Sequence, residues 1–537
     1  MESCIFENGK IFTSDKENIY AEAMLVIDGK ISRIGNKKEA DAFAPSGCKR
    51  VDLKGKRVIP GFVDAHMHPL MLADFSKQIS ALPPDIYSIE ELTEEIKKWR
   101  AENDAGSWCL GWGYDEGKFK ERRSLTRWDL DKGCSDSPVS IMRTCGHIRC
   151  VNSKALEIAG IDRNTPDPDG GEIERDENGE PTGVLKENAR NLITPFMPET
   201  DEATAVENIV ALGKLLTSQG IVAITDMGNL DAGDNYPLYE AAAEKGFKQK
   251  VGVYYMWDFF MGNKDFTIPK ERTEKEQQFF AAGLKLIGDG SVSGKTAWMA
   301  EPYLDSDSCG ISVCSDEQME TAINFCKKTR CQLSMHAMGT KAIERVVNRV
   351  AAEEKWNDGP APYVRVEHVT LPSDESIQKA ADKGIGFVTQ PIFMYAEIES
   401  YLNNLGSDRI KACYPIKEML EKGVKLCFST DAPATSWAVP SDPFPNIKGA
   451  VTRRAYDGTD CGADQAVDVE TAVILYTKES AEIAGFKDQG QLKAGYNADF
   501  VILDRDIFEI SAEDIDKVSV EKTYIGGKCV YEKSTAV

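Results

Sequence analysis

The feature that most constrains the fold of this chain is a repeated alternation of short apolar segments with amphipathic, helix-like segments. Helix-like stretches such as residues 316–329 and 339–355 carry apolar residues at helical spacing. Eight apolar segments end in polar residues and have the length of buried strands; they cover residues 62–68, 221–228, 250–257, 284–290, 332–339, 364–370, 386–391 and 425–433. Eight strand–helix units in succession predict an α/β fold, the (β/α)8 TIM barrel.

The two ends of the chain have a different residue pattern, with short β-rich runs instead of alternating strands and helices. The N-terminal part contains short β-rich runs separated by Asn8-Gly9 and Asp28-Gly29, and such pairs favour tight hairpins. Residues 498–506 and 521–531 return to the same pattern. The sequence therefore predicts a small β-sandwich built from residues 1–60 and 485–537, and a barrel domain over residues 61–484 with an insertion at about 70–200 after the first barrel strand.

The formal net charge of −23 limits the partners of the chain. Nucleic acids and anionic membranes are bound by basic surfaces, so we expect neither, and we expect a small-molecule substrate instead. No apolar run approaches the roughly 18 residues that cross a bilayer, and MESCIFENGK does not begin like a secretory signal. We therefore expect a cytoplasmic protein whose fourteen cysteines are mostly free. A homodimer stays an open expectation, because closed dimers are the commonest oligomers.

The chain has five histidines, and four of them fall at the ends of predicted barrel strands. His66 and His68 end the first strand in PGFVDAHMHPL, and the period of two along a strand turns both toward the barrel interior. His336 ends the fifth strand, His368 the sixth, and Asp431 the eighth. Active sites of TIM barrels lie at these carboxyl ends, and imidazole and carboxylate bind zinc and related ions. A single such histidine could be a buried structural residue, but the joint pattern predicts a metal centre.

Nine stretches, four of which contain the residues just named, extend the pattern over nearly the whole chain: PGFVDAHMHP, LGWGYDEGKF, GHIRCVNSKAL, GEPTGVLKENA, LKLIGDGSVSGKTAWM, SMHAMG, VEHVTL, STDAP and GQLKAGYNADFVILD. In this order they resemble the amidohydrolase superfamily, and within it the amidohydrolase family 3 branch, which includes N-substituted formamide deformylase-like enzymes. The resemblance implies a TIM barrel with a terminal β-sandwich and one or two divalent metal ions at the barrel mouth. Zinc is the first expectation, with iron, manganese or cobalt as alternatives.

The resemblance also implies a ligand that bridges two ions. In two-metal members a lysine on the fourth strand carries a CO2-derived carbamate, and the matching position is Lys285. An unmodified ammonium group has no acceptor atom, so bridging requires the carbamate. Two alternatives stay open: Lys285 pairs with Asp289 as an ordinary strand lysine, or a single-metal site is held by some of the histidines and Asp431.

The expected reaction follows from these ligands. Divalent ions acidify water and polarise a carbonyl, and Asp431 is expected to move a proton from the attacking water to the leaving nitrogen. This predicts a hydrolase of a non-peptide carbon–nitrogen bond, in an amide or an N-acyl or N-formyl small molecule, with Lys285 and His147 as further catalytic candidates. The alternatives are a metal-dependent deaminase of the same superfamily and a non-catalytic relative. Asp431 could instead cap a following helix.

Substrate-binding candidates lie in two motifs and around the fifth histidine. His147 falls in the insertion, and the resemblance places it near the substrate, where it would hydrogen-bond the substrate or a developing oxyanion; a structural role is the alternative. The remaining candidates are Trp112, Tyr114 and Asp115 in GWGYDEG and Lys295 and Trp298 in SGKTAWM. For the aromatic residues the alternative is an ordinary cluster beneath a loop.

One motif partly matches a phosphate-binding loop but lacks an essential residue of that pattern. DGSVSGKT, from Asp289 to Thr296, approaches the phosphate-binding pattern G-x-x-x-x-G-K-[ST]. Its first position is an aspartate in place of glycine, and a carboxylate there would repel phosphate. We therefore reject a nucleotide-binding function.

Overall fold

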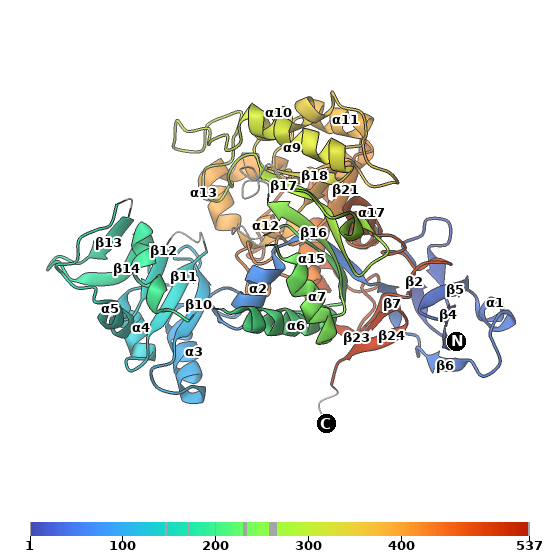
Figure 1. Cartoon of the computed structure of the whole chain (residues 1–537), viewed down its shortest axis with the longest axis horizontal. Coiled ribbons are helices and arrows are strands. Elements are labelled where there is room, and N and C mark those ends of the chain that lie inside the picture. The colour runs from blue at the N-terminus through green and yellow to red at the C-terminus, as the bar shows by residue number, and fades with distance from the viewer. Residues whose placement is uncertain are drawn as a thin grey trace. The chain divides into compact units, whose positions relative to one another are not determined.

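The computed structural model describes residues 2–144, 148–169, 171–198, 200–228, 234–256 and 266–534 (Figure 1). The chain divides into two compact units. The first comprises Met1–Pro69, Ile209–Ala432 and Ser441–Val537, and the second comprises Leu70–Asn208 and Pro433–Pro440. Among the described residues no helix is both long enough and apolar enough to cross a membrane.

The first unit contains an eight-stranded, all-parallel sheet. In chain order its strands are β8 (Phe62–Met67), β15 (Ile221–Asp226), β16 (Lys250–Met256), β17 (Phe279–Ile287), β18 (Gln332–Ala337), β19 (Val364–His368), β20 (Gly386–Thr389) and β21 (Lys425–Phe428), each paired with the next. Just beyond β21 the chain returns to β8, where Asp431 N donates to His66 O (2.8 Å) and His68 N donates to Ala432 O (2.8 Å). These contacts close the sheet, and the predicted TIM barrel is confirmed.

The barrel strands are mostly apolar because helices cover their outer face and side chains fill their interior. β17 begins five residues before its predicted start, since Ala281, Ala282 and Gly283 weakened the strand signal. At Gly283 a Cβ would stand 1.9 Å from Gln332 O, so glycine allows β17 and β18 to approach. Around the barrel lie α6 (Glu202–Ser218), α7 (Tyr236–Glu244), α9 (Asp316–Thr329), α10 (Thr340–Val350), α11 (Asp374–Lys383), α12 (Pro391–Ala396), α13 (Ile398–Arg409), α14 (Ile416–Glu421), α15 (Pro443–Thr452), α16 (Val469–Leu475) and α17 (Lys478–Ala484).

The covering helices are amphipathic in the way the sequence predicts. On α10 the buried residues Ala342, Ile343, Val346, Val347 and Val350 form one stripe. α9 begins with a capping box, in which the Ser315 side chain accepts from Gln318 N and the Gln318 side chain accepts from Ser315 N. Local signals and barrel packing therefore agree at these helices.

The first unit contains two further sheets, and one of them takes strands from both ends of the chain. A six-stranded sheet has the order β24 (Lys528–Glu532), β23 (Val520–Ile525), β22 (Phe500–Leu503), β7 (Arg57–Pro60), β2 (Lys10–Phe12) and β3 (Tyr20–Ala21). A four-stranded sheet has the order β5 (Lys30–Gly35), β4 (Ala23–Ile27), β1 (Ser3–Glu7) and β6 (Lys49–Asp52), flanked by α1 (Lys37–Ala42). Phe6, Phe500 and Tyr524 share one core, with ring centroids 4.5–5.2 Å apart. The boundaries at residues 60 and 485 stay a prediction.

The second unit holds the predicted insertion and has its own core. Its mixed sheet has the order β13 (Gly171–Arg175), β14 (Pro181–Glu187), β12 (Ile148–Val151), β11 (Val139–Arg143), β10 (Cys109–Tyr114) and β9 (Ile79–Ser80). Its helices are α2 (Pro69–Phe75), α3 (Ile89–Glu102), α4 (Arg127–Gly133) and α5 (Ser153–Ala159), and residues 202–208 of α6 also belong to it. The unit extends past residue 200 to Asn208 and adds residues 433–440.

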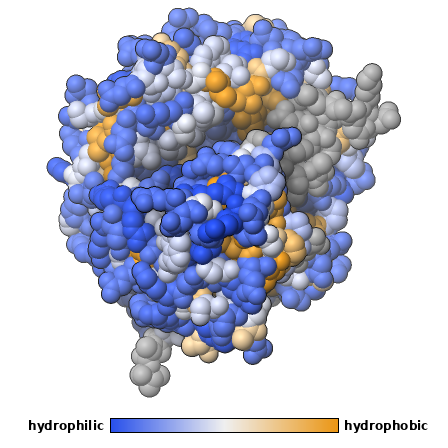
Figure 2. Space-filling model, turned by 90° about the vertical axis from the view of Figure 1, so that its left-hand side faces the viewer, coloured by the Kyte–Doolittle hydropathy of each residue, from blue (hydrophilic) through white to orange (hydrophobic). Residues whose placement is uncertain are grey.

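The hydrophilic surface and the free cysteines are both consistent with what the amino-acid composition predicts. The face shown in Figure 2 is dominated by hydrophilic residues, in keeping with the net charge of −23. The cysteines that the structure describes are all free, and most of them are buried.

Candidate metal centre

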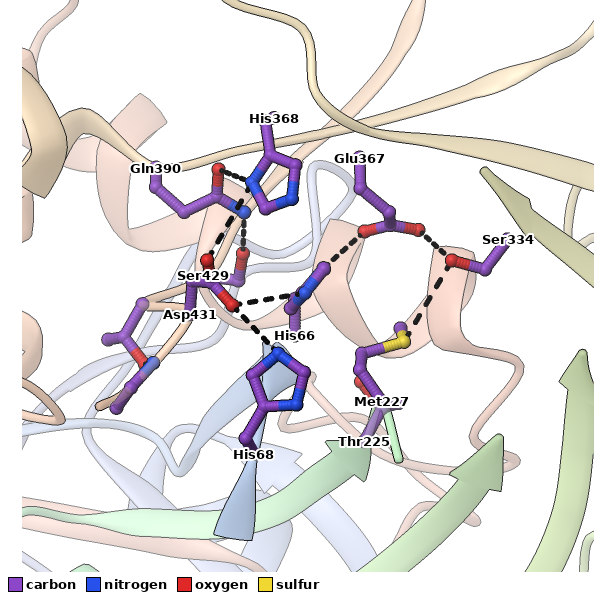
Figure 3. A network of polar contacts seen from close by, with 12 residues as sticks. His66, His68, Thr225, Met227, Ser334, Glu367, His368, Gln390, Ser429 and Asp431 are labelled. Carbon is purple, nitrogen blue, oxygen red and sulfur yellow. Dashed lines mark hydrogen bonds and ion pairs between the residues drawn. The ribbon is translucent and has the colours of Figure 1, made fainter. Parts of the chain in front are cut away.

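Four histidines and one aspartate meet at the carboxyl ends of the barrel strands. Figure 3 shows three of the histidines, His66, His68 and His368, together with Asp431. Ring centroids are 5.7 Å apart for His66 and His68, 4.9 Å for His66 and His368, and 4.4 Å for His336 and His368. Asp431 lies among them, with Oδ1 3.1 Å from His66 Nε2 and 3.3 Å from His68 Nε2. The structure therefore brings together the five residues that the sequence assigned to one mouth of the barrel.

Outer partners decide which nitrogen of the first two histidines faces inward. His66 Nδ1 lies 2.7 Å from Glu367 Oε2, and His68 Nδ1 lies 2.7 Å from Gly228 O. Both partners are acceptors, so both Nδ1 atoms carry a hydrogen, and each ring in its neutral form presents an Nε2 lone pair. Two lone pairs and the Asp431 Oδ1 atom then converge, and this buried Oδ1 makes no hydrogen bond within the described ranges. Three converging acceptors fit a divalent cation.

Protons and metal ions compete at this point. Burial lowers the pKa of His68, but the neighbouring Asp431 carboxylate outweighs burial and raises that pKa overall. Burial alone would likewise raise the pKa of Asp431, yet the histidines hold it well below its usual range. A cation that binds here takes the place of a proton on His68, which is the usual coupling of metal binding to proton release.

The other two histidines differ in the ring nitrogen that is bonded on the outer side of the site: Nε2 in His336 and Nδ1 in His368. His336 Nε2 lies 2.9 Å from Gly290 O, which leaves its Nδ1 atom to face inward. His368 Nδ1 lies 3.0 Å from Gln390 Oε1, and Gln390 Nε2 donates to Ser429 Oγ (2.8 Å), which leaves His368 Nε2. Burial lowers the pKa of His336 to about 4, and burial with the neighbouring His336 lowers the pKa of His368 well below its usual value. Both rings are therefore neutral, which is the form that binds metals.

The backbone is strained where the site residues enter. Arg365 and Glu367 of β19 cross the barrel interior to Ala65 and His66, so alternation would turn His368 outward. Instead His368 has a φ of +75°, and Asp431 has a φ of +58°. Such left-handed conformations cost on the order of 1–3 kcal/mol each in residues other than glycine, and they gather at functional sites.

The first strand also changes phase before the site. Val63 and Ala65 belong to the apolar cluster that fills the lower barrel. Asp64 pairs with Ile224 and Met67 with Asp226, so three steps on β8 oppose two on β15. This irregularity lets His66 point inward although Ala65 does too. The inward orientation of His66 and His68 was predicted from a strict alternation of side chains along the strand, and β8 does not keep that alternation.

Lys285 lies in β17 beneath the cluster and is 1% exposed. Its Nζ atom makes no hydrogen bond to any described residue. Burial lowers the pKa of Lys285 to about 8, against the opposing effects of Glu367 and Asp431. Asp289, the alternative partner, instead accepts from the backbone N–H groups of Trp298, Met338 and Gly339 at 2.8–3.0 Å. The lysine–aspartate pairing considered from sequence is therefore not what the structure shows.

Geometry alone selects part of this set as a metal site. Ligand atoms of His66, His368 and Asp431 lie within 4.8 Å of one another. His68 shares the Asp431 oxygen with His66, and His336 stands next to His368. Two overlapping ligand sets are therefore present, His66 with His368 and Asp431, and His66 with His68 and Asp431.

The substrate-binding candidates have different placements. Lys295 is exposed and Trp298 is half-buried in the segment after β17. In the second unit Trp112 stacks on Phe75, with centroids 5.1 Å apart, and Asp115 Oδ1 accepts from Gly117 N (2.8 Å).

Tyr114 belongs to an ordinary aromatic cluster, which was the alternative to a substrate-binding role. It is 0% exposed in the core of the second unit, where its ring stacks against Phe119. No surface of its ring is therefore free for a ligand. His147 lies outside the described residues.

Three residues of the site were missed from sequence: Glu367, Arg365 and Gln390. Glu367 and Arg365 are 0% exposed and form a bidentate ion pair, with Nε–Oε1 2.5 Å and Nη2–Oε2 2.9 Å. A signal was present, because two opposite charges in the buried strand VRVEHVT must be paired with each other or with the site. Gln390, just after β20, carried no such signal.

Comparison with known proteins identifies the family of the chain. The sequence profile of the amidohydrolase family matches residues 49–531. The chain is 31% identical over 541 residues to a Bacillus subtilis (strain 168) protein named as an amidohydrolase, YtcJ, with 99% of each covered. It is 26% identical over 551 residues to N-substituted formamide deformylase of Arthrobacter pascens, again with 99% of each covered.

A solved structure extends the likeness to three dimensions. The crystal structure of an uncharacterized metal-dependent hydrolase from Pyrococcus horikoshii OT3 matches with a TM-score of 0.75 and 26% identity, covering 95% of this chain and 99% of that one. The chain belongs to the amidohydrolase family, a family of hydrolases.

Proposed function

We propose that this protein hydrolyses a non-peptide carbon–nitrogen bond in a small amide, of the N-acyl or N-formyl kind, with a divalent ion held by His66, His68 and Asp431. The observation that carries the proposal is the convergence of His66 Nε2, His68 Nε2 and Asp431 Oδ1 on one buried point. Zinc is the first candidate, and iron, manganese and cobalt suit the same donors.

The chain's own residues would divide the work as follows. When bound, the ion supplies Lewis acidity, which acidifies water and polarises a carbonyl. Asp431 turns Oδ1 toward His66 and His68, while Oδ2 lies 3.9 Å from His368 Nδ1. We assign to Oδ2 the proton of the attacking water, which it then delivers to the leaving nitrogen. The amide and one water thereby become a carboxylic acid and an amine.

Lys285 is proposed as the carbamate ligand of a second ion. Its neutral Nζ would attack CO2 to form an anionic carbamate and release one proton. The support is that this buried amine has no hydrogen-bond partner among the described residues, and that Glu367 and Asp431 of the same cluster act on its pKa. His336 Nδ1 and His368 Nε2 would complete that site.

Metal content and product analysis test the proposal together. The purified protein, grown with added bicarbonate, is analysed by inductively coupled plasma mass spectrometry and then assayed on N-formyl and N-acyl amines and on aminated heterocycles. Release of a carboxylic acid with an amine supports the proposal, and ammonia from the heterocycles alone would favour the deaminase. A protein that binds no divalent ion after reconstitution would overturn both and favour a non-catalytic relative. Asp431→Asn is the inactive control.

A further inference from the structure

A buried carboxylate next to the candidate metal centre has no role in the chemistry proposed above. Glu367 is 0% exposed and accepts from four donors. They are His66 Nδ1 (2.7 Å), Ser334 Oγ (2.7 Å), Arg365 Nε (2.5 Å) and Arg365 Nη2 (2.9 Å). Figure 3 shows the contacts with His66 and Ser334. Both carboxylate oxygens are therefore used, and one of the four bonds ends on a candidate ligand.

Arg365 is itself fixed, so the carboxylate has little freedom to turn. Its Nη2 atom donates to Ala65 O, and Nη1 lies 3.4 Å from the Tyr254 hydroxyl. The guanidinium also lies 5.3 Å from the centroid of the Tyr254 ring, and that hydroxyl donates to Gln332 Oε1. Glu367 thus stands on a rigid chain of polar groups that runs down the barrel interior.

The contact crosses the barrel instead of joining neighbouring strands. β19 and β8 are separated by β20 and β21 in the closed sheet. A carboxylate that reaches His66 from the far side can only accept at Nδ1, so it selects the tautomer with a free Nε2 lone pair. An amide at the same position could rotate and donate to Nδ1, which would reverse the tautomer.

We propose that Glu367 is a positioning residue that, anchored by Arg365 and Ser334, fixes the ring and tautomer of His66 for a divalent ion. The inference rests on the proposed function, because it needs an ion at His66. It goes beyond that function in assigning to Glu367 a measurable share of the metal affinity.

The test is a double-mutant cycle on Zn²⁺ affinity, measured by competition with a chromophoric chelator. Glu367→Gln keeps the size of the side chain and should weaken Zn²⁺ binding about 10- to 100-fold, the usual cost of losing such an outer partner. In a His66→Ala background the same change should have almost no effect, because its target is gone. Asp499→Asn is the matched control, since Asp499 is a buried carboxylate that accepts only from Gly526 N in the described structure.

Several results would overturn the inference. Equal loss of affinity in both backgrounds would mean that Glu367 acts on the fold, and so would a similar loss in Asp499→Asn. Unchanged affinity in Glu367→Gln would show that His66 needs no such partner. If the wild type binds no Zn²⁺, the proposed function fails first, which is a distinct outcome.

A second variant covers the case in which Glu367→Gln does not fold. Ser334→Ala removes one donor to Oε1 and leaves the Arg365 pair intact. We expect about a threefold loss of Zn²⁺ affinity, the size of one modest hydrogen bond, that disappears in the His66→Ala background. A loss that persists there would contradict the positioning role.

Discussion

The two halves of the barrel interior share strands β8 and β17 and have opposite character. The lower half is an apolar cluster that draws on six strands and on α17, with Val63, Ala223, Phe280 and Cys427 among its members. The upper half carries the histidines, Asp431, Lys285 and the Arg365–Glu367 pair. The lower half stabilises the fold by burying apolar area, and that stability offsets the strain and buried charge above it. The two halves should therefore respond differently to substitution.

The largest effect is expected from removing two ligands of the upper half. His66→Ala combined with His68→Ala should remove the bound ion and all measurable hydrolysis, because two of the three converging donors are lost. Metal content per chain and turnover on the best N-acyl substrate measure this. Far-UV circular dichroism should stay that of the wild type; full metal retention in the double variant would refute the ligand assignment.

Asp431→Asn should be the next most severe change. The amide keeps the shape of the side chain but can neither carry the proton nor bind as an anion. We expect kcat/KM to fall at least about 10³-fold, since general acid–base catalysis alone contributes 10²–10⁴. Activity within tenfold of the wild type would show that another group moves the proton.

A substitution in the lower half should have the opposite effect: it should reduce stability and leave metal binding unchanged. Phe280 is fully buried and packs edge-on against Phe486, with ring centroids 5.4 Å apart. Phe280→Ala should lower the free energy of unfolding by about 3–5 kcal/mol, measured by urea denaturation of the metal-free protein. Zn²⁺ affinity of the folded fraction should not change; a large loss of affinity would mean that the two halves are not separable.

Lys285 sits where the two halves meet, and its substitution sharpens the comparison. Lys285→Met replaces the buried amine by an apolar side chain of similar length. If the lysine bridges two ions as its carbamate, metal content should fall from about two per chain to about one, in line with the loss of an anionic ligand. A wild type that holds a single ion, and keeps it in Lys285→Met, would remove the bridge and leave the single-metal site.

The smallest effect is expected outside the barrel interior. Ser315 caps α9, and Ser315→Ala should cost about 1 kcal/mol of stability, with no change in metal content or turnover. Thermal unfolding of the variant and the wild type at equal metal loading gives the difference. A change in turnover would mean that α9 influences the metal centre, which would contradict this prediction.

The sequence predicts the barrel well because its strands are buried on both faces and are therefore almost continuously apolar. The histidines at the strand ends are visible because there are so few of them. Glu367 and Gln390 were missed because their partners lie on other strands, and only the closed barrel brings them to His66 and His368.

Alternation along a strand explains less than it first suggests. The irregularity in β8 and the left-handed backbone of His368 both shift the side-chain phase at the site itself. Residues 433–440 joined the second unit for a similar reason, since contacts between distant segments leave no local signature.

The central claim is that His66 Nε2, His68 Nε2 and Asp431 Oδ1 converge to bind a divalent ion. The most direct measurement is an anomalous difference map from crystals of the zinc-loaded protein, recorded at the zinc absorption edge. We expect a peak about 2.0–2.2 Å from both Nε2 atoms and from Asp431. Zinc bound at full occupancy away from these three atoms, or no zinc at the barrel mouth at saturating concentration, would contradict it.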